Sequence, residues 1–257
     1  MTTIHATAIV DPQAELGVDV EIGPYCLVGP RARIGDRCRL ISMVRIDEGA
    51  ILGEGCACHH GAAIGGPPQD LKYQGAASRV RAGAGNTFRE FCTVHRATGE
   101  GEETLLGDEN LIMAYAHVAH NCALGSHVIL GNCATLAGHV EVGDYAIVSG
   151  VTPVHQFVKI GAHAIIGGGC RVPKDVPPFV MAAGHPLEVH GLNVVGLRRR
   201  GFSAETLAEL EKLYRLFFRS DLVKEAALAR IRAELAPLPE VEMFCRFIER
   251  SARGLTR

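Results

Sequence analysis

Four histidines in the middle of the chain could perform acid–base chemistry: His117, His120, His139 and His155. An imidazole titrates near neutral pH, so a positioned histidine is the usual general base for taking a proton from a hydroxyl or an amine. His120 plus eighteen residues is Gly138, and eighteen more is Gln156. If the chain returned to the same place every eighteen residues, these three would form one column with His139 and His155 beside it.

A sequence repeat predicts such a return. From Leu106 to Val172 every sixth residue is aliphatic, and the fifth place of each six is mostly small, as at Ala116 and Cys122. A period of six fits neither a helix nor an alternating strand, but it fits a triangular solenoid with one short strand and one corner per six residues. Glycine often holds the second place, as at Gly125 and Gly131, and we expect it to serve the corner.

The repeat also opens the chain, from Ile4, and is interrupted twice. We therefore predict a parallel β-helix of hexapeptide repeats over residues 1–183, with loops near 66–81 and 97–105. Residues 184–257 are expected to form a crossing segment and a C-terminal α-helical domain, with helices starting after Ser203, from Asp221 to Leu235, and near Pro239. Loops that leave a rigid scaffold are the expected carriers of function.

The composition is that of a globular protein with ordinary charge. There are 257 residues, a net charge of −2 and nine cysteines, most of them in the small fifth place. Such cysteines are interpreted as buried and reduced, which favours a cytoplasmic protein. We find no signal peptide, no membrane span and no case for nucleic-acid binding. The helical part is mildly basic and suits an acidic partner.

Several motifs together resemble the UDP-N-acetylglucosamine acyltransferases, the family that begins lipid A biosynthesis. They are G-G-P-P-Q-D-L-K-Y at 65–73, V-H-R-A-T at 94–98, A-H-V-A-H-N-C at 116–122, L-A-G-H-V at 136–140, V-H-Q-F at 154–157 and G-L-R-R-R-G-F at 196–202. The resemblance implies a left-handed parallel β-helix and a homotrimer with active sites in the clefts between subunits. Periodicity does not give the handedness, and the general crossover rule would have predicted a right-handed helix.

The resemblance also implies a reaction. A 3-hydroxyacyl chain would pass from the phosphopantetheine thioester of acyl carrier protein to the 3-position of UDP-N-acetylglucosamine, without a cofactor, a metal or a covalent acyl-enzyme. His120 would be the general base and Gly138 the oxyanion donor. Two residues would set acyl length, Gly168 and, as a second candidate, Pro186.

The remaining site residues are carried over from the family by motif. Gln69 and Asp70 would hold the sugar, and Lys72 would assist the phosphopantetheine arm. The other substrate-binding residues would be His117, His139, His155, Gln156, Asn193, Arg199 and Arg200, the arginines being suited to forked phosphate contacts. Five other histidines are interpreted as tolerated surface residues: His5, His59, His60, His127 and His163.

Two alternatives stay open at this point. Zinc carbonic anhydrases also use hexapeptide β-helices, and His117 and His120 with a third histidine could bind zinc; the Q-D-L-K-Y loop and the basic helical part speak against that. Asn121 and Val195 stand where family members can carry acidic residues. Because Asn121 offers no charge to stabilise a protonated His120, the acceptor could instead be a 3-amino analogue of the UDP-sugar, giving an amide.

Overall fold

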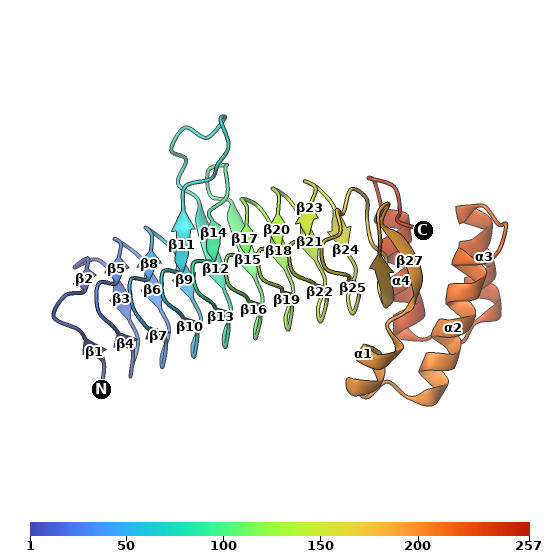
Figure 1. The fold of residues 1–257 in the computed structure, drawn as a ribbon, viewed down its shortest axis with the longest axis horizontal. Coiled ribbons are helices and arrows are strands. Elements are labelled where there is room, and N and C mark those ends of the chain that lie inside the picture. Colours follow the sequence, from blue (N-terminus) through green and yellow to red (C-terminus); the bar gives the residue numbers. More distant parts are fainter.

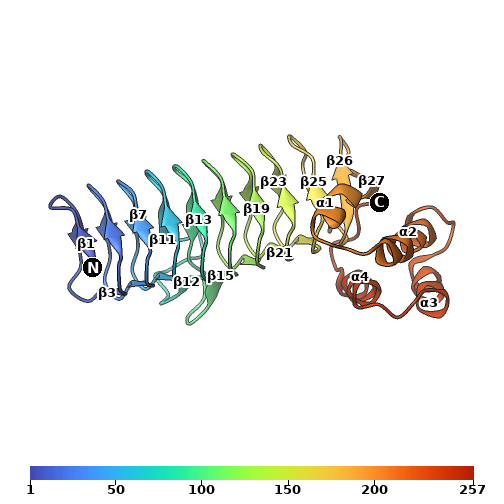
Figure 2. The same ribbon diagram turned by 90° about the horizontal axis from the view of Figure 1, so that it is seen from below.

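The computed structural model describes all 257 residues. The chain forms a long triangular solenoid that ends in a cluster of helices (Figure 1). Turned by 90°, the same view shows the stacked strands as a row with the helices at one end (Figure 2). None of these helices is long and apolar enough to cross a lipid bilayer.

Three sheets make the three faces of the solenoid. The first contains β1 (Thr3–Ile4), β4 (Glu21–Ile22), β7 (Arg39–Leu40), β10 (Ala57–Cys58), β13 (Thr87–Phe88), β16 (Leu111–Ile112), β19 (Ile129–Leu130), β22 (Ile147–Val148), β25 (Ile165–Ile166), β26 (Val180–Ala183) and β27 (Glu188–Leu192). The second contains β2 (Ile9–Val10), β5 (Leu27–Val28), β8 (Arg45–Ile46), β11 (Ala63–Gly66), β14 (Thr93–His95), β17 (His117–Val118), β20 (Thr135–Leu136) and β23 (Pro153–Val154). The third contains β3 (Glu15–Leu16), β6 (Arg33–Ile34), β9 (Ile51–Leu52), β12 (Arg79–Ala82), β15 (Glu103–Leu106), β18 (Ala123–Leu124), β21 (Glu141–Val142) and β24 (Lys159–Ile160).

Strands stack in parallel with the predicted offset of eighteen residues, as where His117 pairs with Thr135 and Val118 with Leu136. The aliphatic first place and the small fifth place of each six point inward. They form one continuous core of 47 buried residues along the axis, which includes Ala116, Cys122 and Leu136. All nine cysteines are free, and eight of them are buried. Small residues are needed because three strands converge on a narrow axis.

The corners differ from the sequence-based expectation. Apart from Gly65, next to the first loop, the glycines in the second place do not have a positive φ; the residues two positions later do, for example His127 after Gly125 and Cys133 after Gly131. Glycine is required for another reason. A Cβ at Gly131 would lie 2.4 Å from the backbone nitrogen of Gly150 on the next coil. These glycines do lie at the corners, and they are needed there because two coils approach closely and not because of a positive φ.

Two loops leave the solenoid on one side, and they are shorter than predicted. The first spans 67–78, between β11 and β12, and the second spans 96–102, between β14 and β15. Both end early because β12 and β15 are four residues long and pair with each other from Arg79 and Glu103 onward. The insertions change the coil offset to 30 residues between Ala63 and Thr93 and to 24 between Thr93 and His117.

Beyond the last coil, β26 and β27 form an antiparallel hairpin that leads into four helices. These are α1 (Val194–Arg199), α2 (Ala204–Phe218), α3 (Lys224–Glu234) and α4 (Pro239–Arg250). Ser203 caps α2 as predicted, since its Oγ accepts the N–H of Thr206 at 3.1 Å. The α3 helix begins at Lys224 and not at Asp221, and Val223 before it gives no side-chain cap. The helices share a second core of 13 buried residues, which includes Phe217 and Phe244.

Candidate active site

The predicted site residues lie at different corners of the triangular coil. The His120 corner lies between β17 and β18 and contains Asn121, His139 and Phe157, which have a positive φ. The next corner along the chain, the Tyr145 corner, contains His127, Tyr145 and His163. The third, the Gly168 corner, contains Cys133, Val151 and Gly169. One protomer thus presents its candidate groups in three directions.

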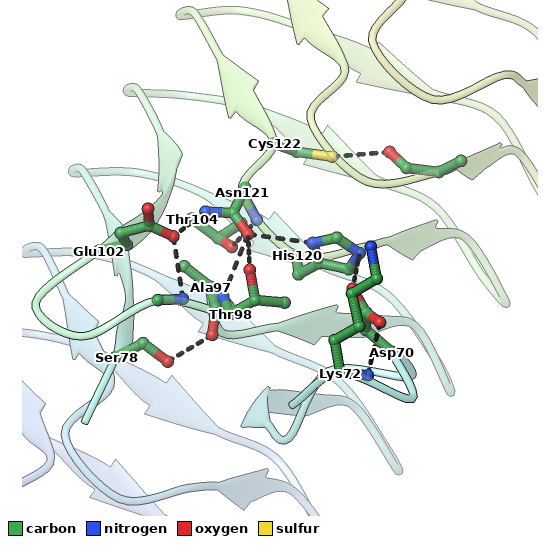
Figure 3. Close-up of polar contacts among 12 residues, drawn as sticks. Asp70, Lys72, Ser78, Ala97, Thr98, Glu102, Thr104, His120, Asn121 and Cys122 are labelled. Carbon is green, nitrogen blue, oxygen red and sulfur yellow. Dashed lines mark hydrogen bonds and ion pairs between the residues drawn. The ribbon is translucent and has the colours of Figure 1, made fainter. Parts of the chain in front are cut away.

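At the His120 corner one ring nitrogen is oriented by a neighbouring amide, and the other faces a carboxylate without a hydrogen bond (Figure 3). The Nδ1 atom lies 3.0 Å from Oδ1 of Asn121, and Nε2 lies 3.9 Å from Oδ2 of Asp70. The side chain is 16% exposed. His139 approaches edge-on, with ring centroids 5.2 Å apart. A ring that is partly exposed, oriented by a neighbour and open at Nε2 has the geometry of a general base.

The predicted stacking of Gly138 on His120 is confirmed. The N–H of His139 donates to the carbonyl of His120 at 3.0 Å, and the N–H of Phe157 donates to that of Gly138 at 3.1 Å. A Cβ at Gly138 would lie 2.4 Å from Cε1 and 2.5 Å from Nε2 of His120. Glycine is thus the residue that leaves the imidazole room. The Gly138 N–H makes no hydrogen bond within the protomer, so it is free to donate.

The first loop brings Asp70 to the His120 corner. Oδ1 of Asp70 accepts the N–H of Lys72 at 2.9 Å, which turns the loop locally and leaves Oδ2 facing the imidazole. The side chains of Gln69 and Lys72 are exposed and make no hydrogen bond or ion pair in the protomer. Leu71 between them is fully exposed. The loop tip therefore presents both polar and apolar side chains to the outside.

His117 lies deeper and has a neighbour that the sequence reasoning missed. Its Nδ1 is 2.7 Å from Oγ1 of Thr93, and its ring meets that of His95 edge-on at 4.8 Å. Burial, with smaller effects from His95 and His120, lowers the pKa of His117 to about 4. Burial also lowers the pKa of His95, whose Nδ1 is buried without a partner. Both rings are therefore neutral near pH 7 and suited to hydrogen bonding.

His139, His155 and Gln156 belong to the same corner. The pKa of His139 is lowered, first by burial and then by His120, against the opposing charges of Glu102 and Asp70. Its ring stacks on Phe157 at 4.7 Å. His155 and Gln156 lie farther along the axis, where Nδ1 of His155 is 3.2 Å from the carbonyl of Gln156.

Asn193 and Arg200 lie instead at the Tyr145 corner. Asn193 caps α1 by accepting the N–H of Gly196 at 3.1 Å and donates to the His163 carbonyl at 3.0 Å, so its amide already has a structural role. The Arg200 guanidinium lies 5.1 Å above the Tyr145 ring, and its Nη1 is buried without a partner. Burial lowers the pKa of Arg200. An unpartnered, partly buried guanidinium is suited to receive a phosphate oxygen.

Other predicted residues lie away from these contacts. Arg199 is exposed, and so is Val195 on the same helix. Gly168 is exposed at the Gly168 corner, where a Cβ would first meet the carbonyl oxygen of Gly150 at 3.4 Å. Pro186 is exposed in the turn between β26 and β27.

His163 contradicts its prediction as a tolerated surface residue. Its ring stacks between Tyr145 at 5.0 Å and Phe179 at 5.7 Å, with the Phe202 edge at 5.0 Å. Its Nδ1 is buried without a partner, and burial together with the charge of Arg200 lowers its pKa to about 4. The sequence could not reveal this because Phe179 and Phe202 come from segments outside the repeat.

Three more residues at the His120 corner were missed: His95, Thr98 and Glu102. Thr98 and Glu102 hydrogen-bond to Asn121 from the second loop (Figure 3). A signal for Glu102 did exist, since it lies eighteen residues before His120 and so belongs to the column of Gly138. His95 was hidden because the loop insertion changes the offset between its strand and β17.

One groove of the chain lies away from this corner. This groove of about 680 Å³ lies between the solenoid and α4, lined by Glu141, Lys159 and Met243 among others. No group of three or more histidine, cysteine, aspartate or glutamate side chains is close enough to hold a metal ion within the protomer.

Family models match two parts of the chain. The model described as UDP-N-acetylglucosamine O-acyltransferase, domain 2, matches residues 175–256. The bacterial transferase hexapeptide model, which describes six repeats, matches residues 103–138.

Curated relatives match over the full length. An acyl-[acyl-carrier-protein]–UDP-N-acetylglucosamine O-acyltransferase from Thermodesulfovibrio yellowstonii is 47% identical over 100% of both chains. One from Trichlorobacter lovleyi is 51% identical over 99% of both. Their names describe transfer to oxygen with an acyl carrier protein as donor, and so favour neither the 3-amino acceptor nor a zinc anhydrase.

Solved structures agree in fold. A UDP-N-acetylglucosamine acyltransferase from Bacteroides fragilis superposes with a TM-score of 0.97 at 38% identity, covering 99% of this chain and 100% of the other. The corresponding protein of Acinetobacter baumannii gives a TM-score of 0.95 at 40% identity, covering 99% of each. The predicted left-handed parallel β-helix with a C-terminal helical domain is confirmed by these matches together with the hexapeptide repeats.

Proposed function

The chain belongs to the family of acyl-[acyl-carrier-protein]–UDP-N-acetylglucosamine O-acyltransferases, and we propose that its acyl transfer takes place at the His120 corner. The protein is an acyltransferase that moves an acyl chain from acyl carrier protein to UDP-N-acetylglucosamine, an early step of lipid A biosynthesis. The assignment of this corner depends on one observation: His120 is oriented at Nδ1, open at Nε2, and stacked on the free N–H of Gly138.

The reaction can follow from these groups. Nε2 of His120 takes the proton of the sugar 3-hydroxyl as its oxygen attacks the thioester carbonyl. The Gly138 N–H donates to the oxyanion that forms. The carbon–sulfur bond then breaks, and His120 returns the proton to the leaving thiolate of the phosphopantetheine arm. Because the sugar oxygen attacks the thioester directly, no covalent acyl-enzyme and no cofactor are needed.

The substrate contacts follow from the position of each group. Asp70 and Gln69 hold the sugar from the first loop, and the neutral rings of His117 and His139 hydrogen-bond to sugar or phosphate oxygens. Lys72, exposed on the same loop, meets the phosphopantetheine arm. His155 and Gln156 extend the contact surface along the axis.

A homotrimer explains why one protomer is insufficient. Arg200, with its unpartnered guanidinium, lies at the Tyr145 corner and not at the His120 corner. If three solenoids pack side by side, the His120 corner of one subunit can face a different corner of its neighbour. Arg200, Arg199 and Asn193 would then hold the uridine and diphosphate across the cleft. The His120 corner would then form one wall of that cleft.

The acyl chain and the carrier protein follow from the same arrangement. Gly168 carries no side chain, and a Cβ there would already contact the carbonyl oxygen of Gly150 at 3.4 Å, so glycine at this place suits a long 3-hydroxyacyl chain, with Pro186 as a second candidate for the limit. The basic C-terminal helices suit the acidic surface of an acyl carrier protein, and the reduced cysteines suit the cytoplasm.

The test offers the purified protein a series of 3-hydroxyacyl carrier-protein thioesters with UDP-N-acetylglucosamine, and identifies the products by mass. We expect one acylated UDP-sugar per carrier thiol released, and an unmodified enzyme mass at every time point. Sedimentation of the same sample should give a trimer. An acylated enzyme, or release of free fatty acid without a sugar product, would contradict the proposal.

A further inference from the structure

Asn121 stands between the candidate general base and a carboxylate (Figure 3). Its Oδ1 lies 3.0 Å from Nδ1 of His120, and its Nδ2 donates to Oε2 of Glu102 at 2.7 Å. Oδ1 also accepts the backbone N–H of Thr98 at 3.1 Å and its hydroxyl at 3.0 Å. The backbone N–H of Asn121 donates to Oγ1 of Thr104 at 2.8 Å. Both ends of this side chain, and its backbone, are therefore fixed.

These partners determine which way the amide points. A backbone N–H can only donate, so the atom facing Thr98 must be the oxygen, and an ionised carboxylate can only accept, so the atom facing Glu102 must be the nitrogen. The Asn121 oxygen therefore faces Nδ1 of His120, which has to carry the hydrogen. In the neutral ring Nε2 is then the free base, on the side of Asp70 and Gly138.

Glu102 is ionised in this network. The Asn121 donor, followed by the Gly99 N–H at 2.9 Å from the same oxygen, lowers the pKa of the Glu102 carboxyl, and both His139 and His120 act in the same direction. Glu102 comes from the end of the second loop and lies one coil below His120 in the same column. The loop thus delivers a carboxylate to the side of His120 that faces away from the substrate.

We propose that Glu102 is a positioning residue for the acyl transfer, and that it acts on His120 through the amide of Asn121. The proposal rests on the function proposed above, with His120 as its base. Where an adjacent acidic residue would contact the imidazole directly, this chain uses an amide that keeps Nδ1–H oriented and connects it to a carboxylate one hydrogen bond farther away. No proton moves through the amide: His120 gains and loses its proton at Nε2 only.

Other charged or titratable groups also face His120, and their positions differ from that of Glu102. Asp70 lies 3.9 Å from Nε2, on the substrate side. His139 meets the ring edge-on, and His117 and His95 lie beyond it as neutral rings. Of the groups that face His120, only Asn121, which is hydrogen-bonded to Glu102, lies at Nδ1 of His120. Because Glu102 is exposed, its charge is screened, and a moderate effect on turnover is expected.

A double-mutant cycle tests whether Glu102 acts on His120 through the amide of Asn121. In E102Q, kcat should fall by about three- to fivefold, the size expected for an exposed charge, with the KM for the UDP-sugar little changed. In N121D, two carboxylates face each other, and adding E102Q should now raise kcat, because the amide introduced at position 102 can donate to the carboxylate introduced at position 121. The reversal of sign is the decisive result, since a role of Glu102 in holding the loop would be lost equally in both backgrounds. Equal effects of E102Q in the two backgrounds would contradict the proposal that Glu102 acts through Asn121.

The matched control is E103Q, one residue along, whose carboxylate pairs with Arg79 and Arg81 on the outer face. It should leave kcat unchanged. In E102Q the acid limb of the kcat/KM profile should move to lower pH, because a carboxylate that stabilises the protonated imidazole has been removed. An unmoved acid limb would contradict the proposal.

A second measurement needs no turnover. Nitrogen-15 spectra of histidine-labelled protein, with the His120 signal identified by its loss in H120A, should show hydrogen on Nδ1 near pH 8. A hydrogen on Nε2 instead of Nδ1 in the wild-type protein would contradict the proposed role of Asn121 and Glu102 even if acyl transfer is active. Conversely, a protein with the expected tautomer that makes no acylated sugar would contradict the proposed function and leave the hydrogen-bond geometry standing.

Discussion

His120 and His163 occupy neighbouring corners of the same solenoid, yet their surroundings are opposite. His120 is oriented at Nδ1 by Asn121 of its own corner, and its open Nε2 lies 3.9 Å from Asp70 of the first loop. His163 is stacked between aromatic rings, and its Nδ1 has no partner. The repeat supplies the same backbone in both places. What differs is the segment that docks there: polar loops at His120, and the apolar start of the helical domain at His163.

The comparison teaches that residue type and repeat position do not define chemistry in this fold. A histidine becomes a base where polar groups orient it and leave one nitrogen open, and it becomes part of the core where aromatic rings enclose it. Substitutions at the two corners should therefore fail in different ways: in turnover at His120, and in stability at His163.

The largest effect is expected from H120A. Loss of the general base should lower kcat by about 100- to 10,000-fold, while the melting temperature and trimer mass stay near those of the wild type because the side chain is outside the solenoid core. Steady-state kinetics and thermal unfolding measure the two properties. H5A, at an exposed histidine of the first coil, is the matched control. A folded H120A protein that keeps most of its activity would remove His120 from the mechanism.

The next largest effect on kcat is expected from filling the space between Gly138 and the His120 ring. In G138A the new Cβ would lie about 2.4 Å from the imidazole, so the ring must move. A displacement of about 1 Å can cost roughly 100-fold in rate, whereas the core is untouched. We expect kcat to fall by about 100-fold with little change in melting temperature. G191A places the same methyl group where nothing lies within 4 Å, and it should behave like the wild type.

A smaller effect should distinguish the Tyr145 corner from the His120 corner. R200K keeps the charge but loses the forked geometry, so the KM for the UDP-sugar should rise by about tenfold while kcat falls less. R198Q, at an exposed side chain of α1, the helix that ends just before Arg200, is the control. Initial rates over a range of UDP-sugar concentrations measure both constants. A fall in kcat alone would mean that Arg200 acts on the reaction step and not on nucleotide binding.

Much of the scaffold was predictable because a period of six leaves few solutions. The column of His120 and Gly138 followed from counting eighteen residues, and the small fifth place predicted the buried cysteines. The handedness did not follow from the period, and the family resemblance supplied it. The reason for the second-place glycines was not predictable, because the close approach of two coils cannot be seen in one coil.

The rest of the site was less predictable because it depends on insertions. Each loop shifts the register of the coils around it, so counting by eighteen fails across residues 67–78 and 96–102. Thr98 and His95 were hidden for this reason. Asn121 itself offers His120 no charge, but its amide donates to Glu102 of the second loop, a contact that the sequence reasoning did not include. Counting one coil backwards from His120 would have found it.

The smallest effect is expected from H163F, and it concerns stability. The folded pKa of His163 is about 4, below its usual value of 6.5, so the unfolded chain binds more protons between these values. The stability contributed by neutral His163 is therefore present above about pH 6.5 and lost as pH falls toward 4. Phenylalanine does not titrate, and Phe157 and Phe179 already occupy equivalent positive-φ positions. The melting temperature of H163F should exceed that of the wild type by about 2–4 °C at pH 5, with a smaller difference at pH 7.5, whereas H5F should show no pH-dependent difference. Thermal unfolding at both pH values measures this, and an equal difference at both would mean that the His163 ring is not held neutral by its aromatic neighbours.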